Sequence, residues 1–228
     1  MKTTIRRIAS VLFVATVVMG LCAFSAQCAD KENKISCKIS GKINHDSWEK
    51  GQKSTVEFSR IPATIEEFKE LQAVLGLEPQ GAVALQVMAF EMFRRDEALG
   101  SEALQLNNTM TNLSSTKYQL KELNRNGDSY ARPYLAAALL EGATPENGYA
   151  PSKPYKVNVR VNPVQKYAYS NSYDANVIYL QVDSKGWDTN WRAVEVIKPA
   201  DSDFYVVFNC PALYTQCKKI RGTWQGLE

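Results

Sequence analysis

The sequence predicts an α+β fold in which an N-terminal helical half packs on a C-terminal antiparallel β-meander of about four strands. Apolar residues recur at helical spacing between about 62 and 142, and they alternate with polar residues between about 155 and 217. A connector at 143–154, with three prolines, separates the two patterns. Each half has one strongly apolar surface, so we expect both to share the core of a single domain over 30–228.

The first 29 residues have the pattern of a secretory signal peptide. A cationic start precedes an apolar run at 8–24, and small residues follow it at 25–29. We therefore expect a signal peptide over 1–29 and an extracytoplasmic location: periplasm, cell surface or secreted. An uncleaved anchor is the alternative, because the run approaches the ~20 residues that span a bilayer. The membrane would then be contacted only through the leader.

The charges of the chain argue against nucleic-acid binding. Of 27 Lys and Arg, three lie in the leader, and the remaining 24 balance 24 Asp and Glu. Binding to phosphates needs a surplus of cations on one face, and no Lys/Arg run is longer than two. We expect no nucleic-acid partner.

The helical half begins after two expected strands, at 35–43 and 54–58. Thr64 and Glu67 have the spacing of a capping box, which predicts a helix that Gly76 ends. Pro79 can start a second helix running to about Arg94.

This second helix is apolar nearly all round, so we expect it at the centre of the domain. Two shorter helices are expected at 101–107 and 115–123, and a fifth at 133–141, closed by Gly142.

The meander is predicted from alternation with a period of two. Tyr155, Val157 and Val159 alternate with polar residues, as in a half-buried strand at 155–161. Further strands are expected at 176–183, 191–198 and 204–210, joined by loops of hairpin length.

Most chemistries that depend on a sequence motif are excluded. His45 is the only histidine, which rules out sites built from several imidazoles, and no glycine-rich phosphate loop occurs. We expect no cofactor and no metal. The acids in predicted turns, such as Asp201 and Asp203, are explained by turn formation. Paired carboxylates or a cysteine activated by His45 remain possible catalytic groups.

Three cysteines lie beyond the leader. Cys210 and Cys217 bracket six residues, a loop short enough for a disulfide. The alternative is that Cys37, Cys210 and Cys217 are all small buried side chains.

Aromatic residues near turns give the positive indication of function. They combine flat rings with polar tips, which suits contact with sugars, peptides or partner proteins. The candidate ligand-binding residues are Tyr167, Tyr169, Tyr173, Trp187 and Trp191. The alternative is that the tryptophans cover the end of the sheet and the tyrosines pack on its edge.

Several runs between about Pro62 and Cys217 resemble those of a known family. These are IPATIEEFK (61–69), YARPYL (130–135), GATPENGY (142–149), GWDTNWR (186–192) and NCPALYTQC (209–217). The family that they resemble is one of uncharacterised exported bacterial proteins, a domain of unknown function found largely in gut and host-associated species. The resemblance implies a bacterial envelope context and no particular catalytic residue.

Taken together, these features predict an exported, non-catalytic domain of the bacterial cell envelope that binds an envelope glycan, a peptide or a protein. The alternative is an envelope hydrolase that uses paired carboxylates or a cysteine.

Overall fold

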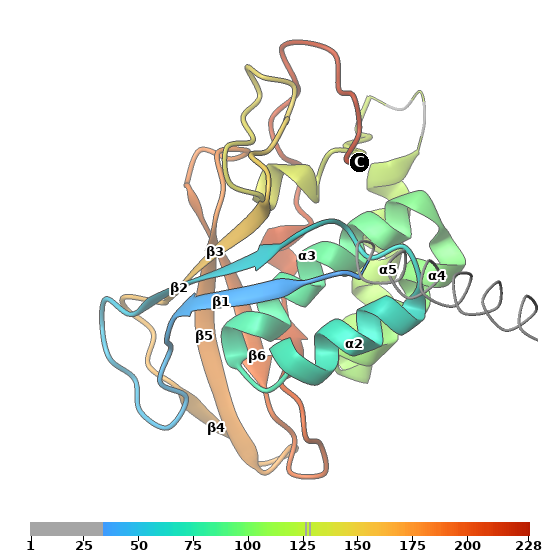
Figure 1. Cartoon of the computed structure of the whole chain (residues 1–228). Coiled ribbons are helices and arrows are strands. Elements are labelled where there is room, and N and C mark those ends of the chain that lie inside the picture. Colours follow the sequence, from blue (N-terminus) through green and yellow to red (C-terminus); the bar gives the residue numbers. More distant parts are fainter. Residues whose placement is uncertain (1–33, 126, 128) are drawn as a thin grey trace, which may run out of the picture. The chain divides into compact units, whose positions relative to one another are not determined.

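An antiparallel sheet runs through the part of the chain that the computed structural model describes, residues 34–125, 127 and 129–228 (Figure 1). Residues Ser36–Glu228 form one unit, to which everything below refers. The signal peptide expected over 1–29 lies outside the described residues.

The sheet has seven strands, in the order β1-β2-β3-β5-β6-β7, with β4 paired to β5. Their bounds are β1 Cys37–Gly41, β2 Lys53–Phe58, β3 Tyr155–Val161, β4 Ala168–Ser170, β5 Ala175–Asp183, β6 Trp191–Ile197 and β7 Val206–Asn209. The four strands expected in the meander are present as β3, β5, β6 and β7, but the sheet has more strands than this meander. The N-terminal hairpin joins the C-terminal meander, since Val56 of β2 lies opposite Val157 of β3, and β4 is an additional short strand.

Four helices in the described part of the chain gather on one side of the sheet (Figure 1). They are α2 Ile65–Leu75, α3 Pro79–Arg95, α4 Glu97–Asn107 and α5 Met110–Asn124. Alternate strand residues such as Val157, Leu180 and Val196 are buried beneath them. The intervening residues, among them Lys156 and Gln181, are half-buried on the open face. The core thus lies between the sheet and the helices.

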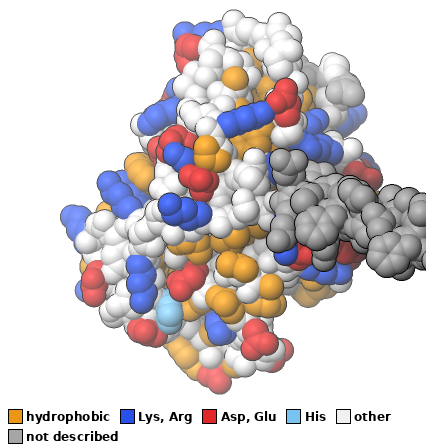
Figure 2. Space-filling view, in the orientation of Figure 1, with side chains coloured by type: hydrophobic (Ala, Val, Ile, Leu, Met, Phe, Trp, Pro, Cys, Tyr) orange, Lys and Arg blue, Asp and Glu red, His pale blue; other side chains and the backbone are white. Residues whose placement is uncertain are grey.

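Helix α3 occupies the centre of this core, as its sequence predicts. Each residue from Pro79 to Phe93 is buried, because the sheet lies on one side of the helix and the other helices surround the rest. Figure 2 shows acidic and basic side chains interspersed over the visible face of the molecule, in keeping with the balanced composition.

The start of α2 confirms the predicted N-cap. The Thr64 hydroxyl accepts a hydrogen bond from the Glu67 amide at 3.2 Å. In a complete capping box, the Glu67 carboxylate would also accept a hydrogen bond from the backbone amide of the N-cap residue, Thr64, and this bond is not the one that it makes. It accepts from the Ala63 amide at 2.7 Å and pairs with Arg60.

The fifth helix predicted over 133–141 is wrong. The structure has turns there and a short 3₁₀ helix, η1 (Ala137–Leu139). Almost all of this run is buried, so apolar composition does not single out one helical face. The chain must also leave the helical path, because the Glu141 amide bonds to the Lys156 carbonyl beside the sheet.

A sharp corner joins α3 to α4. Helix α3 begins at Pro79 as predicted and ends one residue later than predicted, whereas α4 ends at Asn107 as predicted but begins four residues earlier. Asp96 is the single residue between the helices, and its carboxylate caps α4 by accepting from the Ala98 and Leu99 amides. Gly100 then packs on the α3 backbone, where an added Cβ would lie 2.0 Å from the Phe93 Cα. Only glycine fits this approach.

Gly100→Ala therefore destabilises the domain by about 3 kcal/mol, because the two helices must separate. Gly222→Ala is the matched control, since a Cβ added there would have nothing within 4 Å. Urea unfolding of both variants measures the difference. Equal stabilities would contradict the described corner.

Candidate functional site

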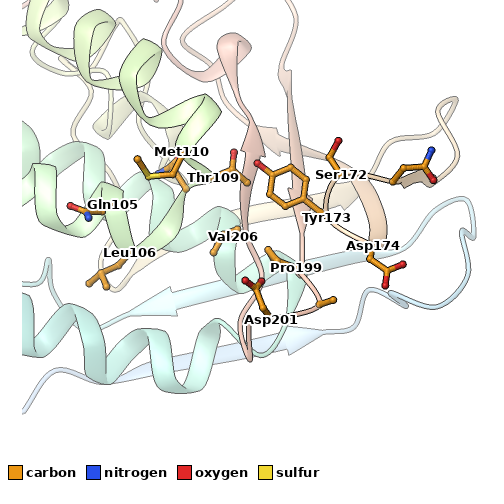
Figure 3. A pocket seen from close by; sticks show the side chains of 13 residues that line it. Gln105, Leu106, Thr109, Met110, Ser172, Tyr173, Asp174, Pro199, Asp201 and Val206 are labelled. Atoms are coloured by element: carbon orange, nitrogen blue, oxygen red, sulfur yellow. The ribbon is translucent and has the colours of Figure 1, made fainter.

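A hollow of about 580 Å³ opens where three separate segments meet (Figure 3). The α4–α5 junction, the β4–β5 turn and the β6–β7 loop each contribute one wall. The lining residues are Gln105, Leu106, Asn108, Thr109, Met110, Asn171, Ser172, Tyr173, Asp174, Pro199, Ala200, Asp201 and Val206. We call this the first hollow.

The α4–α5 junction reaches the hollow because it is bonded to the edge strand of the sheet. The Thr109 amide donates to the Val207 carbonyl at 3.0 Å, and Asn108 forms a parallel bridge with Val207. The Thr109 hydroxyl donates to the Phe208 carbonyl at 3.4 Å. These bonds cover part of an edge that would otherwise expose unpaired backbone groups.

The two turns on the other side of the hollow also hold each other. The Ala200 amide donates to the Tyr173 carbonyl at 3.3 Å. The Tyr173 ring packs edge-on against Phe208, with ring centroids 5.7 Å apart. Asp174 has the left-handed φ of 49°, and its carboxylate accepts a hydrogen bond from the Tyr169 hydroxyl.

A buried network of amide side chains fixes Asn108 in the wall of the hollow. Asn108 and Gln86 of α3 exchange two hydrogen bonds, at 2.9 and 3.0 Å. Asn107 donates to the same Gln86 oxygen at 3.0 Å, and Asn112 donates to the Asn108 oxygen at 2.8 Å. The junction is thereby tied to the central helix as well as to the sheet.

The thiol of Cys210 lies against this network. Gln86 and Asn112 point amide nitrogens at its sulfur from 3.6 and 3.3 Å, and the Thr116 hydroxyl lies at 3.8 Å. Burial raises the pKa of Cys210 to about 11, so the sulfur is a neutral thiol at physiological pH.

The disulfide considered between Cys210 and Cys217 is not formed; both are free, buried thiols. Their surroundings differ, because Cys217 lies near Arg132, whose Nε donates to the Cys217 carbonyl at 3.0 Å. Burial raises the pKa of Cys217 to about 12. The alternative from the sequence, small buried side chains, describes these two residues, while Cys37 is half-buried.

The first hollow combines many neutral hydrogen-bonding groups with acids and a few apolar groups. Amides come from Gln105, Asn108 and Asn171, and the carboxylates from Asp174 and Asp201. No Lys, Arg or His is among the described lining residues. Such a lining suits a neutral or cationic polar molecule and disfavours an anion.

The structure does not bring the five predicted aromatic residues together. Tyr173 lines the first hollow, and Tyr169, which is 59% exposed, touches it through Asp174. Tyr167 donates its hydroxyl to the Asn44 carbonyl at 2.7 Å, and burial raises its pKa to about 12. The Tyr167 hydroxyl is therefore already engaged in a hydrogen bond within the protein.

The two tryptophans have structural roles. Trp187 is only 8% exposed and donates to the Thr215 hydroxyl at 3.2 Å, which removes it from the accessible surface. Trp191 is half-buried under the Arg160 guanidinium, 4.0 Å from the ring centroid to Cζ. For these residues, the alternative of packing at the sheet is the better description.

His45 lies in a separate polar hollow of about 290 Å³, lined also by Asp46, Lys198 and Tyr205. Its Nε2 is 3.4 Å from the Asp46 carboxylate. None of the three described cysteines lines this hollow. A thiol activated by His45 therefore has no support from the contacts around it.

Metal-binding clusters and membrane-spanning helices are both absent from residues 34–125, 127 and 129–228. These residues contain no group of three or more His, Cys, Asp or Glu side chains placed to hold a metal ion. No helix among them is long and apolar enough to span a membrane.

The fold and the hollow define an α+β domain with a polar surface site. A family model described as a domain of unknown function, DUF6935, matches residues 60–221, so the chain belongs to this family. The matched range agrees with the span of the runs that indicated such a family. No curated protein and no solved structure matches the chain.

The state of the thiols can be measured directly. Because burial keeps Cys210 and Cys217 protonated and inaccessible, we expect iodoacetamide at pH 8 to label Cys37 while sparing both. All three are labelled after unfolding in guanidinium chloride. Peptide mass mapping reads the result. A Cys210–Cys217 peptide lighter by two hydrogens would contradict the free thiols.

Gln86→Leu tests the amide network. The variant leaves one amide N–H of Asn107 and one of Asn108 without its buried acceptor, at a cost of about 3 kcal/mol in the free energy of unfolding. Gln119→Leu, on the half-exposed part of α5, is the control and changes stability by less than ~0.5 kcal/mol. Equal small effects in urea unfolding would show that the network does not stabilise the fold.

Proposed function

We propose that this chain is an exported, non-catalytic binding domain of the bacterial cell envelope, and that the first hollow binds a neutral glycan. The observation that carries the proposal is the lining: amides, hydroxyls and two carboxylates around one half-buried tyrosine, with no Lys, Arg or His among the described residues that line the hollow.

Sugar hydroxyls both donate and accept hydrogen bonds, and the exposed amides of Gln105 and Asn171 can do the same. Asn108 uses its side-chain hydrogen bonds on Gln86, Asn112 and the Leu104 carbonyl, so it fixes this wall of the hollow in place before a ligand binds. The Tyr173 ring offers a flat apolar surface beside these polar groups. The site is therefore partly preorganised for a polar ligand with apolar faces.

Export and the envelope location are supported by the leader pattern at 1–29 and by the resemblance to exported bacterial proteins. A peptide or a partner protein is the other class of ligand for the same site. The absence of a cation from the described lining gives no partner for a peptide's C-terminal carboxylate, which favours the glycan.

The test is binding of the protein to an array of bacterial cell-wall and capsular glycans, followed by calorimetry with the glycans retained. Tyr173→Ala and Asn171→Ala are each expected to weaken binding at least about tenfold, which is ~1.4 kcal/mol. Tyr179→Ala, at a half-buried position in β5, is the matched control and keeps full affinity. Binding of no glycan, or equal binding by all variants, would overturn the proposal.

A glycan hydrolase is the second candidate, because Asp174 and Asp201 line the same hollow. Two carboxylates across a glycosidic bond are the requirement of that chemistry. For a non-catalytic domain, we expect prolonged incubation with a bound glycan to release no new reducing ends. Release that stops in Asp201→Asn, with binding retained, would establish the hydrolase instead.

A further inference from the structure

Three tyrosines converge at a second hollow, of about 420 Å³, which the sequence did not indicate as a site. Tyr118 comes from α5, Tyr130 from the segment after it, and Tyr214 from the residue after the 3₁₀ helix η2 (Pro211–Leu213). The other lining residues are Gln119, Glu122, Leu123, Thr215 and Gln216. We call this the second hollow.

The rings of the second hollow are presented to solvent on a supported frame. Tyr118 is 64% and Tyr130 is 68% exposed. The Gln216 side chain donates to the Tyr130 carbonyl at 3.2 Å, which links two of the walls. Next to Tyr214, the Thr215 hydroxyl accepts hydrogen bonds from the buried Trp187 and from Arg192. The predicted Trp187 thus supports the aromatic surface without being part of it.

The second hollow carries less charge than the first. Its one acid, Glu122, pairs with Arg125 at 3.0 Å, and the remaining polar groups of the described lining are amides and hydroxyls. Leu123 is a buried apolar residue in the lining. Tyrosine rings, amides and little net charge suit the apolar faces and hydroxyls of a sugar.

The two hollows lie along the same helix. Met110 of α5 lines the first and Tyr118 lines the second, eight residues or about 12 Å further along the axis. The chain from Val206 to Tyr214 accompanies α5 in the same direction. Thr109 is bonded to Val207 at one end, and Thr116 contacts Cys210 further along.

We propose that the second hollow is a further sugar-binding subsite and that the ligand is a glycan chain lying along α5 across both hollows. This inference rests on the proposed function of the first hollow. A chain that occupies both subsites gains affinity because its second contact is intramolecular. A single sugar or a disaccharide engages one hollow only.

The test compares glycans of increasing length by calorimetry on the mature protein. The probes are β-1,4-linked N-acetylglucosamine oligomers, which are uncharged, from disaccharide to octasaccharide. We expect wild-type affinity to rise at least about tenfold with length. Tyr118→Ala and Tyr130→Ala keep the disaccharide affinity and lose this rise, while Tyr179→Ala keeps both.

The outcomes separate the two proposals. Disaccharide binding through Tyr173, with no gain for longer chains or with a gain that survives both tyrosine variants, overturns the second subsite and leaves the first hollow intact. A wild-type protein that binds none of the probes overturns the glycan ligand and the second subsite together. Circular dichroism of each variant establishes that it is folded.

Discussion

Helix α3 is enclosed by the sheet and by the other helices, so a polar side chain on it has to find its partner inside the protein. Gln86 does so through Asn107 and Asn108, which fixes the α4–α5 junction against the edge of the sheet. Glu91, 1% exposed, pairs with Arg94 and Arg95 at the end of the helix. The Arg95 side chain also donates to the Leu227 carbonyl. The hydrogen bonds and ion pairs made by polar side chains of α3 therefore position both the candidate site and the C-terminal segment.

The elements that the sequence predicts well are those in which one local pattern decides the outcome. Thr64 and Pro79 mark the starts of α2 and α3, and the alternation from Tyr155 predicts the full length of β3. The pairing of β2 with β3 joins residues about a hundred positions apart, and no local pattern contains it. The prediction of a helix at 133–141 failed for a different reason. Almost all of this run is buried, so its apolar composition suits a turn as well as a helix.

The candidate site was predicted only through Tyr173. Its other walls come from Gln105–Met110 and from Pro199–Asp201, which meet because the edge strand β7 accepts the helix junction. The polar run Asn107-Asn108-Thr109 between two helical patterns was a usable sign of a junction. It gave no sign that Asn108 would join a buried network, since that depends on Gln86 of another helix. The sequence context of Trp187 suggested direct contact with a ligand. Because Trp187 is buried, it instead supports the aromatic surface of the second hollow.

Binding of a neutral glycan in the first hollow, through the exposed amides of its walls, can be observed at the amides themselves. The most direct measurement is nuclear magnetic resonance of the asparagine and glutamine side-chain amides during titration with soluble cell-wall glycans. We expect the signals of Gln105 and Asn171, the two exposed amides of the lining, to shift first and to saturate together. Unchanged signals there, with a shift of Asn176 beside His45 or with no shift at all, would contradict glycan binding in this hollow.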